Sequence, residues 1–210
     1  MTRTSRYVSI ATLGFVVLVV CGFIWHNYLE YRIFPKRWGV VETGRLYRSG
    51  QISPSLIKKE LQEHHIKVVV DLQFHENSAA QIAEAKAIEQ LGIKQYRFPL
   101  NGNGTGDIKH YAAAIATIKQ SLANGQPVLV HCAAGTQRTG GVIAVWQTLV
   151  RGESVPTAIA ELERYDWRPK KNRILLEYLD QNMNQLVAAL VELDVLPKAP
   201  DKLPDFEAGK

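Results

Sequence analysis

The feature that most constrains the fold is a short apolar strand that runs into a small-residue loop and then into a helix. Residues 127–131 (Pro-Val-Leu-Val-His) have the β-branched, apolar character of a buried strand. Residues 132–139 are mostly small or polar, and residues 140–151 show the apolar spacing of a helix. A strand joined to a helix in this way is typical of α/β proteins, in which helices cover a parallel sheet.

The same alternation of strand and helix continues along the chain. Strands are expected over 66–72 and 94–100, and helices over 79–91, 108–123, 155–165 and 174–193. We therefore expect an α/β domain with a mostly parallel central sheet and flanking helices. Hydrophobic residues make up 46% of the chain and charged residues 21%, which excludes a chain that is disordered throughout. The only cysteines are Cys21 and Cys132, which excludes both a disulfide framework and a four-thiolate metal site.

The N-terminal part carries a long apolar run. Residues 7–25 contain no charge, and as a helix they would reach about 28 Å, close to the hydrocarbon core of a bilayer. This favours a single-pass membrane anchor over residues 1–28, with a cleaved signal peptide or a buried core helix as alternatives. Positive charges that follow the run outnumber those before it by one, which favours a cytoplasmic location for the rest of the chain.

Three further regions complete the predicted organisation. Residues 29–40 are interpreted as a linker and 41–195 as the folded domain. Residues 196–210 contain three prolines and balanced charges, which predicts a flexible tail.

The loop that follows the strand at 127–131 has the residues of a phosphate site with a nucleophile. Backbone N–H groups converge between a strand end and a helix N-terminus, and the helix dipole adds positive charge there. Gly135 lets the loop curl tightly, and the planar fork of Arg138 suits two phosphate oxygens. In this field Cys132 should be a thiolate poised to attack phosphorus, and Thr139 could hydrogen-bond the sulfur. The alternative, that Cys132 is a small buried hydrophobe, explains neither Gly135 nor Arg138.

These residues carry a resemblance. His131, Cys132, Gly135, Arg138 and Thr139 match the His-Cys-x5-Arg-Ser/Thr signature, so residues 41–190 resemble the protein tyrosine phosphatase superfamily. Residues 45–51 (Arg-Leu-Tyr-Arg-Ser-Gly-Gln) and 69–72 are similar to segments of the bacterial and fungal atypical dual-specificity branch, although Gln73 stands where that branch has Arg. The resemblance implies a three-layer fold and a hydrolase with neither metal nor cofactor. It also implies phosphate binding by the whole loop, which comprises Cys132, Ala133, Ala134, Gly135, Thr136, Gln137 and Arg138.

The general acid is where the sequence departs from the family. The family supplies an Asp about thirty residues before the Cys, but here that position falls in the glycine-rich loop 101–106, which has no carboxylate. Asp107 follows in the same loop and is a candidate acid, because the glycines could make the loop pliable, or else the N-cap of the helix over 108–123. Asp71 is interpreted as structural, and His131 as a residue that orders the loop backbone.

The sequence leaves the substrate class open and is compatible with rival chemistries. The net charge of +5 fits an anionic partner without choosing among substrate, lipid and nucleic acid; with this loop we expect a phosphomonoester and no nucleic acid. None of the variable loop positions (Ala133, Ala134, Thr136, Gln137) is basic, which favours phosphoproteins, phosphotyrosine before phosphoserine or phosphothreonine. The alternatives are a phosphate-recognising pseudophosphatase or another Cys-x5-Arg chemistry, such as sulfur transfer or arsenate reduction.

Overall fold

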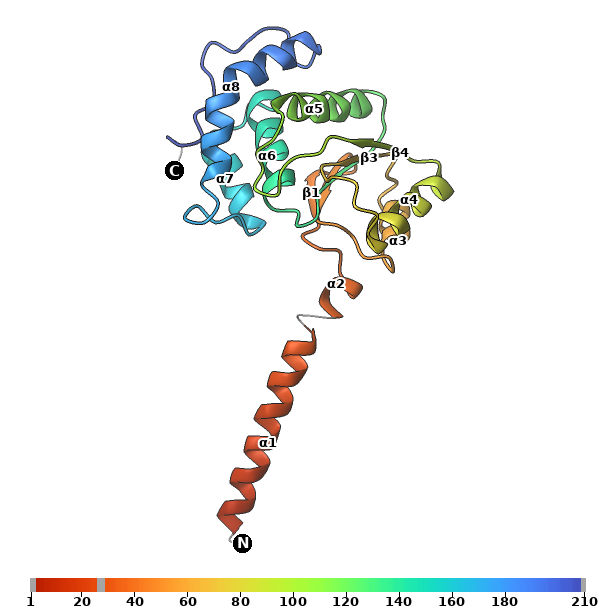
Figure 1. The fold of residues 1–210 in the computed structure, drawn as a ribbon, viewed down its shortest axis with the longest axis vertical. Coiled ribbons are helices and arrows are strands. Elements are labelled where there is room, and N and C mark those ends of the chain that lie inside the picture. Colours follow the sequence, from red (N-terminus) through yellow and green to blue (C-terminus); the bar gives the residue numbers. More distant parts are fainter. Residues whose placement is uncertain (1–2, 26–28, 209–210) are drawn as a thin grey trace. The chain divides into compact units, whose positions relative to one another are not determined.

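A computed structural model describes residues 3–25 and 29–208 (Figure 1). The chain divides into two units, residues 1–34 and 35–210. The first unit contains α1 (Arg3–Ile24) and α2 (Glu30–Ile33). None of the helices in the described residues combines the length and the apolar character needed to cross a membrane, so the predicted anchor over 1–28 lacks structural support. Residues 1–2 and 26–28 of that prediction lie outside the described residues.

The second unit is built on one mixed sheet of five strands. In spatial order the strands are β1, β2, β5, β3 and β4; only β1 and β2 pair antiparallel. Their bounds are Gly39–Glu42 (β1), Leu46–Ser49 (β2), Val68–Asp71 (β3), Lys94–Arg97 (β4) and Val128–His131 (β5). The prediction of a mostly parallel central sheet is therefore confirmed. The sequence did not predict β1 and β2, because each has four residues with a glycine or charged side chains and shows no clear periodicity.

Helices cover both faces of this sheet and make the three layers. Val68, Val70 and Val130 face the core under α5 to α8, whereas Val69 and Leu129 face the core under α3 and α4 (Figure 1). This alternation is the side-chain period of a strand buried on both faces. The helices of the two layers are α3 (Ile57–Glu63), α4 (Ala79–Leu91), α5 (Ile108–Ala123), α6 (Gln137–Val145) with the π-helical η2 (Trp146–Val150), α7 (Val155–Arg164) and α8 (Ile174–Glu192).

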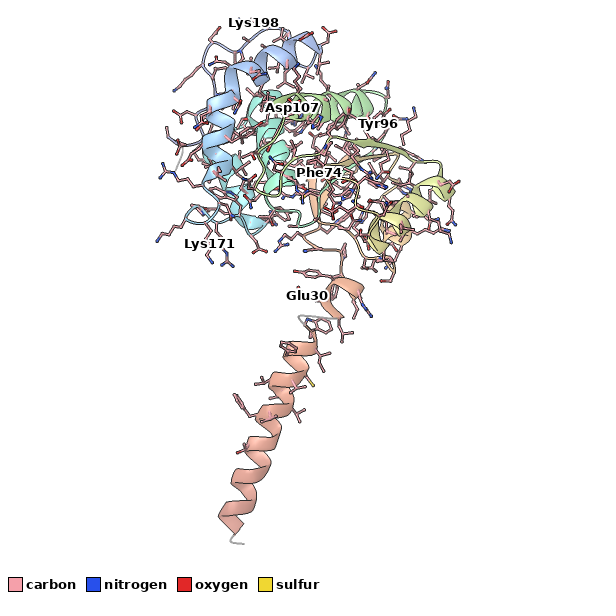
Figure 2. All side chains as sticks on the ribbon, in the orientation of Figure 1. Glu30, Phe74, Tyr96, Asp107, Lys171 and Lys198 are labelled. Atoms are coloured by element: carbon pink, nitrogen blue, oxygen red, sulfur yellow. The ribbon has the colours of Figure 1, made fainter. Side chains whose placement is uncertain are left out.

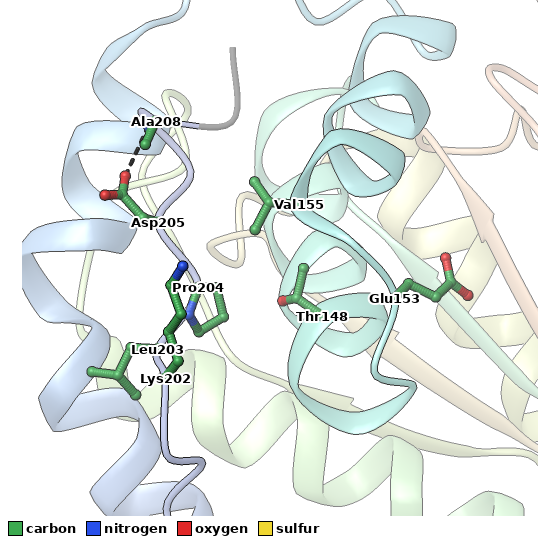
Figure 3. Close-up of a pocket in the computed structure, with 8 residues that line it drawn as sticks. All are labelled: Thr148, Glu153, Val155, Lys202, Leu203, Pro204, Asp205 and Ala208. Atoms are coloured by element: carbon green, nitrogen blue, oxygen red, sulfur yellow. Dashed lines mark hydrogen bonds between the residues drawn. The ribbon is translucent and has the colours of Figure 1, made fainter.

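Residues 196–208 of the predicted flexible tail pack against the domain, and residues 209–210 lie outside the described residues. Phe206 is completely buried, and the N–H groups of Phe206 and Glu207 donate to the Asp180 carboxylate of α8 at 2.8 and 2.9 Å. Between this segment and the start of α7 lies a pocket whose lining includes Thr148, Val155 and Leu203 (Figure 3). None of its lining residues belongs to loop 132–139, so the pocket is separate from the site described below. The burial of Phe206 and the hydrogen bonds to the Asp180 carboxylate hold the segment, up to residue 208, against the domain.

Candidate active site

Cys132 lies at the carboxyl end of β5, where the chain turns into the N-terminus of α6. Its Sγ accepts a hydrogen bond from the Gly135 N–H at 3.1 Å, and the residue is only 1% exposed. Burial alone would raise the pKa of the thiol. The positive charge of Arg138 opposes this effect most strongly, and Thr139 and Gly135 oppose it as hydrogen-bond donors. Together they lower the Cys132 pKa. The structure thus brings together the predicted nucleophile, the predicted guanidinium and the predicted hydroxyl.

Three consecutive carbonyl groups of the loop accept hydrogen bonds from other segments. Ala133 O accepts the Gln51 N–H at 3.2 Å, Ala134 O accepts Arg37 Nη1 at 2.8 Å, and Gly135 O accepts Arg48 Nη2 at 2.6 Å. Because a trans peptide points its N–H opposite to its C=O, these bonds turn the following N–H groups toward the loop interior. The loop therefore presents a set of inward N–H donors, which is the arrangement of an anion-binding nest.

Gly135 is required by this geometry. Its φ is +78°, and a Cβ at this position would lie 2.5 Å from the backbone nitrogen of Gly50. An L side chain would be strained by the first property and would clash through the second.

Arg138 is anchored at one end of its guanidinium. Its Nη1 donates to Leu72 O at 3.3 Å, and its Nε is buried without a hydrogen-bond partner among the described residues. A buried donor without a partner is costly in a folded protein unless a ligand satisfies it. A phosphate held by the loop N–H groups would meet that need, as the sequence predicts.

Arg48 is a site residue that the sequence analysis did not identify. Its side chain is fully buried, its guanidinium carbon lies 3.8 Å from the centre of the Tyr165 ring, and Nη1 lies 3.3 Å from Glu161 Oε1. Through Gly135 O it fixes the centre of the phosphate loop. The available signal was an arginine inside the short segment 45–51, but only the fold places it beneath the loop.

Two basic residues from the predicted linker lie near the loop. Lys36 O accepts the Gly50 N–H at 2.7 Å, and Arg37 bridges Ala134 O and Asp166, with Nε 2.8 Å from Oδ2. Burial and then Arg37 lower the pKa of Lys36, while the nearby charge of Cys132 acts in the opposite direction. Lys36 and Arg37, which fall in the segment 29–40 predicted to be a linker, therefore lie beside loop 132–139.

Asp107 caps a helix in the structure. It is exposed at the start of α5, where its Oδ1 accepts the Lys109 N–H at 2.9 Å (Figure 2). The loop before it is fixed, because Tyr111 Oη donates to Gly104 O at 2.6 Å and Tyr178 Oη donates to Gly106 O at 2.8 Å. The capping alternative is thus the geometry observed, and the glycines do not leave the loop pliable. The role of Asp107 as an acid stays a prediction.

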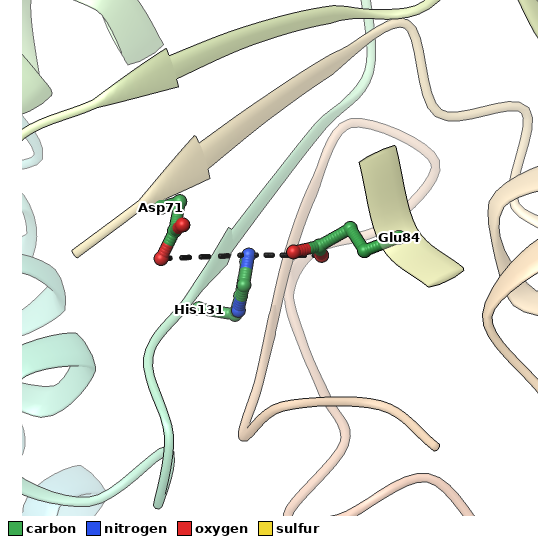
Figure 4. A group of neighbouring side chains, drawn as sticks. All are labelled: Asp71, Glu84 and His131. Carbon is green, nitrogen blue, oxygen red and sulfur yellow. Dashed lines mark ion pairs between the residues drawn. The ribbon is translucent and has the colours of Figure 1, made fainter. Parts of the chain in front are cut away.

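Behind Cys132 lies a buried group of charged residues. Asp71, Glu84 and His131 place ligand-type atoms within 4.8 Å of one another, which among the described residues is the one such group that could hold a metal (Figure 4). Its oxygens already have partners, since Asp71 bonds to Arg97 Nε at 2.9 Å and the Gln73 N–H at 2.9 Å. Glu84 lies 3.1 Å from His131 Nε2. The group is therefore an ion-pair network, and Asp71 is structural as predicted from its position in a strand.

Comparison with known families gives one match over this region. The family described as a DSP-PTPase phosphatase of polymorphic toxin systems (Tc-R-P) matches residues 43–153, more than half of the chain. That range contains β2, the phosphate loop and α6. No curated protein matches the chain.

Solved structures share the fold at low sequence identity. A mutant form of Tk-PTP is 18% identical with a TM-score of 0.59 and covers 71% of this chain and 95% of its own. The core catalytic domain of the PP-IP phosphatase SIW14 from S. cerevisiae is 21% identical with a TM-score of 0.58, covering 79% and 98%. TpbA from P. aeruginosa is 20% identical with a TM-score of 0.57, covering 73% and 96%. These likenesses show the fold of the domain.

Proposed function

The chain belongs to the DSP-PTPase phosphatase family of polymorphic toxin systems, and on that premise we propose that it hydrolyses phosphate monoesters through a cysteinyl-phosphate intermediate on Cys132. The observation that carries the proposal is the geometry of the loop. A sulfur whose pKa is lowered sits at the base of inward N–H groups, beside the anchored guanidinium of Arg138. This arrangement combines a nucleophile with a cradle for the anion that it attacks.

The proposed reaction has two displacements. The Cys132 thiolate forms a bond to phosphorus while the ester P–O bond breaks, and the leaving oxygen takes a proton from an acid or from water. Water then attacks phosphorus, the P–S bond breaks, and inorganic phosphate leaves with regeneration of the thiolate. The loop N–H groups and Arg138 hold the non-bridging oxygens in both steps, and Thr139, which helps to lower the Cys132 pKa, stabilises the leaving sulfur.

Phosphotyrosine is the substrate that the variable loop positions favour. None of Ala133, Ala134, Thr136 and Gln137 offers a cation to a second anionic group. A structure of P. aeruginosa TpbA in complex with phosphotyrosine is among those that share the fold, with a TM-score of 0.57 and 19% identity.

A small molecule with several phosphates is the second candidate substrate, and Lys36 is the observation that favours it. Arg37 Nη1 donates to Ala134 O, and the charges of Lys36 and Cys132 are close enough to affect the Lys36 pKa, so both cations lie near the loop. The PP-IP phosphatase SIW14 shares the fold. To decide, kcat/KM should be measured for a phosphotyrosine peptide and an inositol pyrophosphate in the wild type and in Lys36→Met. A polyphosphate enzyme should lose about tenfold on the inositol substrate alone, the effect of roughly one charged contact. Lys171→Met, an exposed lysine between α7 and α8, is the matched control.

Cys132→Ser tests the chemistry itself. The alcohol is not ionised at neutral pH, so turnover of p-nitrophenyl phosphate should disappear while vanadate or phosphate binding to the loop and Arg138 remains. Turnover close to that of the wild type would exclude covalent catalysis by this cysteine. A wild type that binds phosphate but hydrolyses no ester would support the pseudophosphatase alternative instead.

A further inference from the structure

Glu84 is a buried carboxylate that the proposed reaction does not use. It lies in the middle of α4, is 1% exposed, and its Oε1 is 3.1 Å from His131 Nε2. His131 is also 1% exposed and immediately precedes Cys132 in the chain. A carboxylate of this kind is expensive to bury, so its contact with an imidazole next to the nucleophile calls for an explanation.

The charges around His131 balance only when its imidazole is protonated. Asp71 on β3 lies 3.9 Å from His131 Nε2, but Arg97 on β4 already neutralises it through a 2.9 Å bond. Glu84 on α4 then has His131 as its cationic partner. With a neutral imidazole the network would hold one uncompensated negative charge behind the thiol, which would oppose its ionisation.

Two glutamines connect the carboxylates and hold them in place. Gln51 Nε2 donates to Glu84 Oε2 at 3.5 Å, and Gln73 Nε2 donates to Gln51 Oε1 at 2.6 Å. The Gln73 N–H donates to Asp71 Oδ1 at 2.9 Å. Gln51 also donates its N–H to Ala133 O of the phosphate loop. The network is therefore built into the same contacts that orient the loop.

We propose that Glu84 is a positioning residue for the nucleophile: it keeps His131 protonated and oriented behind Cys132, so that a buried imidazolium helps to hold Sγ as a thiolate. This rests on the proposed cysteine chemistry. Burial opposes a charged imidazole, but Glu84 first and Asp71 next outweigh it and raise the pKa of His131 to about 9, to which Cys132 also contributes. Coupling between two titrating groups is reciprocal, so a thiolate that favours the imidazolium is itself favoured by it.

The test measures Cys132 ionisation without any substrate. In the full chain with Cys21→Ser, which leaves one thiol, the pH dependence of alkylation by iodoacetamide reports the Cys132 pKa. Glu84→Gln keeps the size and the hydrogen-bonding capacity but removes the charge. We expect the alkylation midpoint to rise by about one pH unit, which lowers thiolate reactivity about tenfold below the midpoint. Glu89→Gln, an exposed carboxylate on the same helix, should leave the midpoint unchanged.

Two further measurements keep the proposal falsifiable. His131→Asn should raise the midpoint as Glu84→Gln does, and the double variant should add nothing, because both changes remove one charge pair. If Glu84→Gln does not fold, the ¹⁵N signals of His131 in the wild type decide, and both ring nitrogens should be protonated at pH 7. An unchanged midpoint in folded Glu84→Gln, or a neutral His131 at pH 7, overturns the role of Glu84. Phosphatase turnover is measured separately, so a wild type without turnover but with the shifted midpoint would reject only the proposed function.

Discussion

Two loops at the carboxyl edge of the sheet are built in opposite ways. Loop 132–139 has its carbonyl groups fixed by donors from other segments and surrounds Cys132 with positive charge. Loop 101–107 is also fixed, by Tyr111 and Tyr178, but its one carboxylate, Asp107, is turned to the backbone of α5. In the proposed reaction the scaffold would therefore supply phosphate binding and nucleophile activation, whereas proton donation to the leaving group has no evident residue in loop 101–107.

The largest effect should come from the guanidinium of loop 132–139. Arg138→Lys keeps the charge but cannot reproduce the planar fork that joins Leu72 O to the phosphate position. We expect kcat/KM for p-nitrophenyl phosphate to fall by about 10²–10³, nearly as far as in Arg138→Ala. A lysine variant with most of the wild-type activity would show that Arg138 acts only as a diffuse charge.

The next largest effect is expected from the loss of Arg48, which bonds to the Gly135 carbonyl of loop 132–139. Arg48→Met removes the donor to Gly135 O and leaves Glu161 without its cation. Breaking such a buried pair should lower the free energy of unfolding by about 3 kcal/mol, measured by urea denaturation, and weaken vanadate binding.

The matched control for this change is the double variant Arg48→Met with Glu161→Gln. It should recover part of the stability, because no carboxylate is left unpaired, but should not recover vanadate binding. Equal stability of the single and double variants would contradict the ion-pair explanation.

A loss of similar size is expected from Gly135→Ala, which tests how tightly loop 132–139 is packed. Gly125 has a similar φ, +68° against +78°, but a Cβ there would meet nothing within 4 Å. Gly125→Ala should therefore cost only the conformational strain, about 1–2 kcal/mol. Gly135→Ala should cost about 1–3 kcal/mol more from the clash with Gly50, with a parallel loss of turnover. Equal losses in thermal unfolding would mean that the loop can move away from Gly50.

The elements that sequence reasoning predicted best are those determined by local patterns. The helix over 79–91 has the expected bounds, with Ser78 as N-cap and Gly92 in the left-handed conformation after it. The strand within 127–131 and the loop after it were also placed correctly, because a β-branched run followed by a glycine and an arginine leaves few alternatives.

The residues that sequence reasoning missed act across the fold. Arg48 is 87 positions from Gly135 in the chain, and Arg37 is 97 positions from Ala134. Glu84 looks like any helical glutamate, and only the register of β3, β5 and α4 places it against His131. The burial of Phe206 was not predicted for a related reason: prolines and charges suggested a free tail over 196–208, but this burial depends on a surface formed by α8.

The smallest effect is expected at Asp107, and it decides how far the contrast between the two loops extends. Because Asn is as good an N-cap as Asp, Asp107→Asn should change neither the melting temperature nor turnover of p-nitrophenyl phosphate, and Asp107→Ala should lose about 1 kcal/mol of stability. The observed bond from Asp107 Oδ1 to the Lys109 N–H supports this expectation. A general acid would respond differently, since an amide cannot donate the proton that an alkyl leaving group requires. Asp107→Asn would then lose about 10²–10⁴ in kcat on alkyl phosphates but little on activated aryl esters. That selective loss would identify Asp107 as the general acid. It would also show that loop 101–107 moves during the reaction, because in the structure the Asp107 carboxylate is bonded to the backbone of α5.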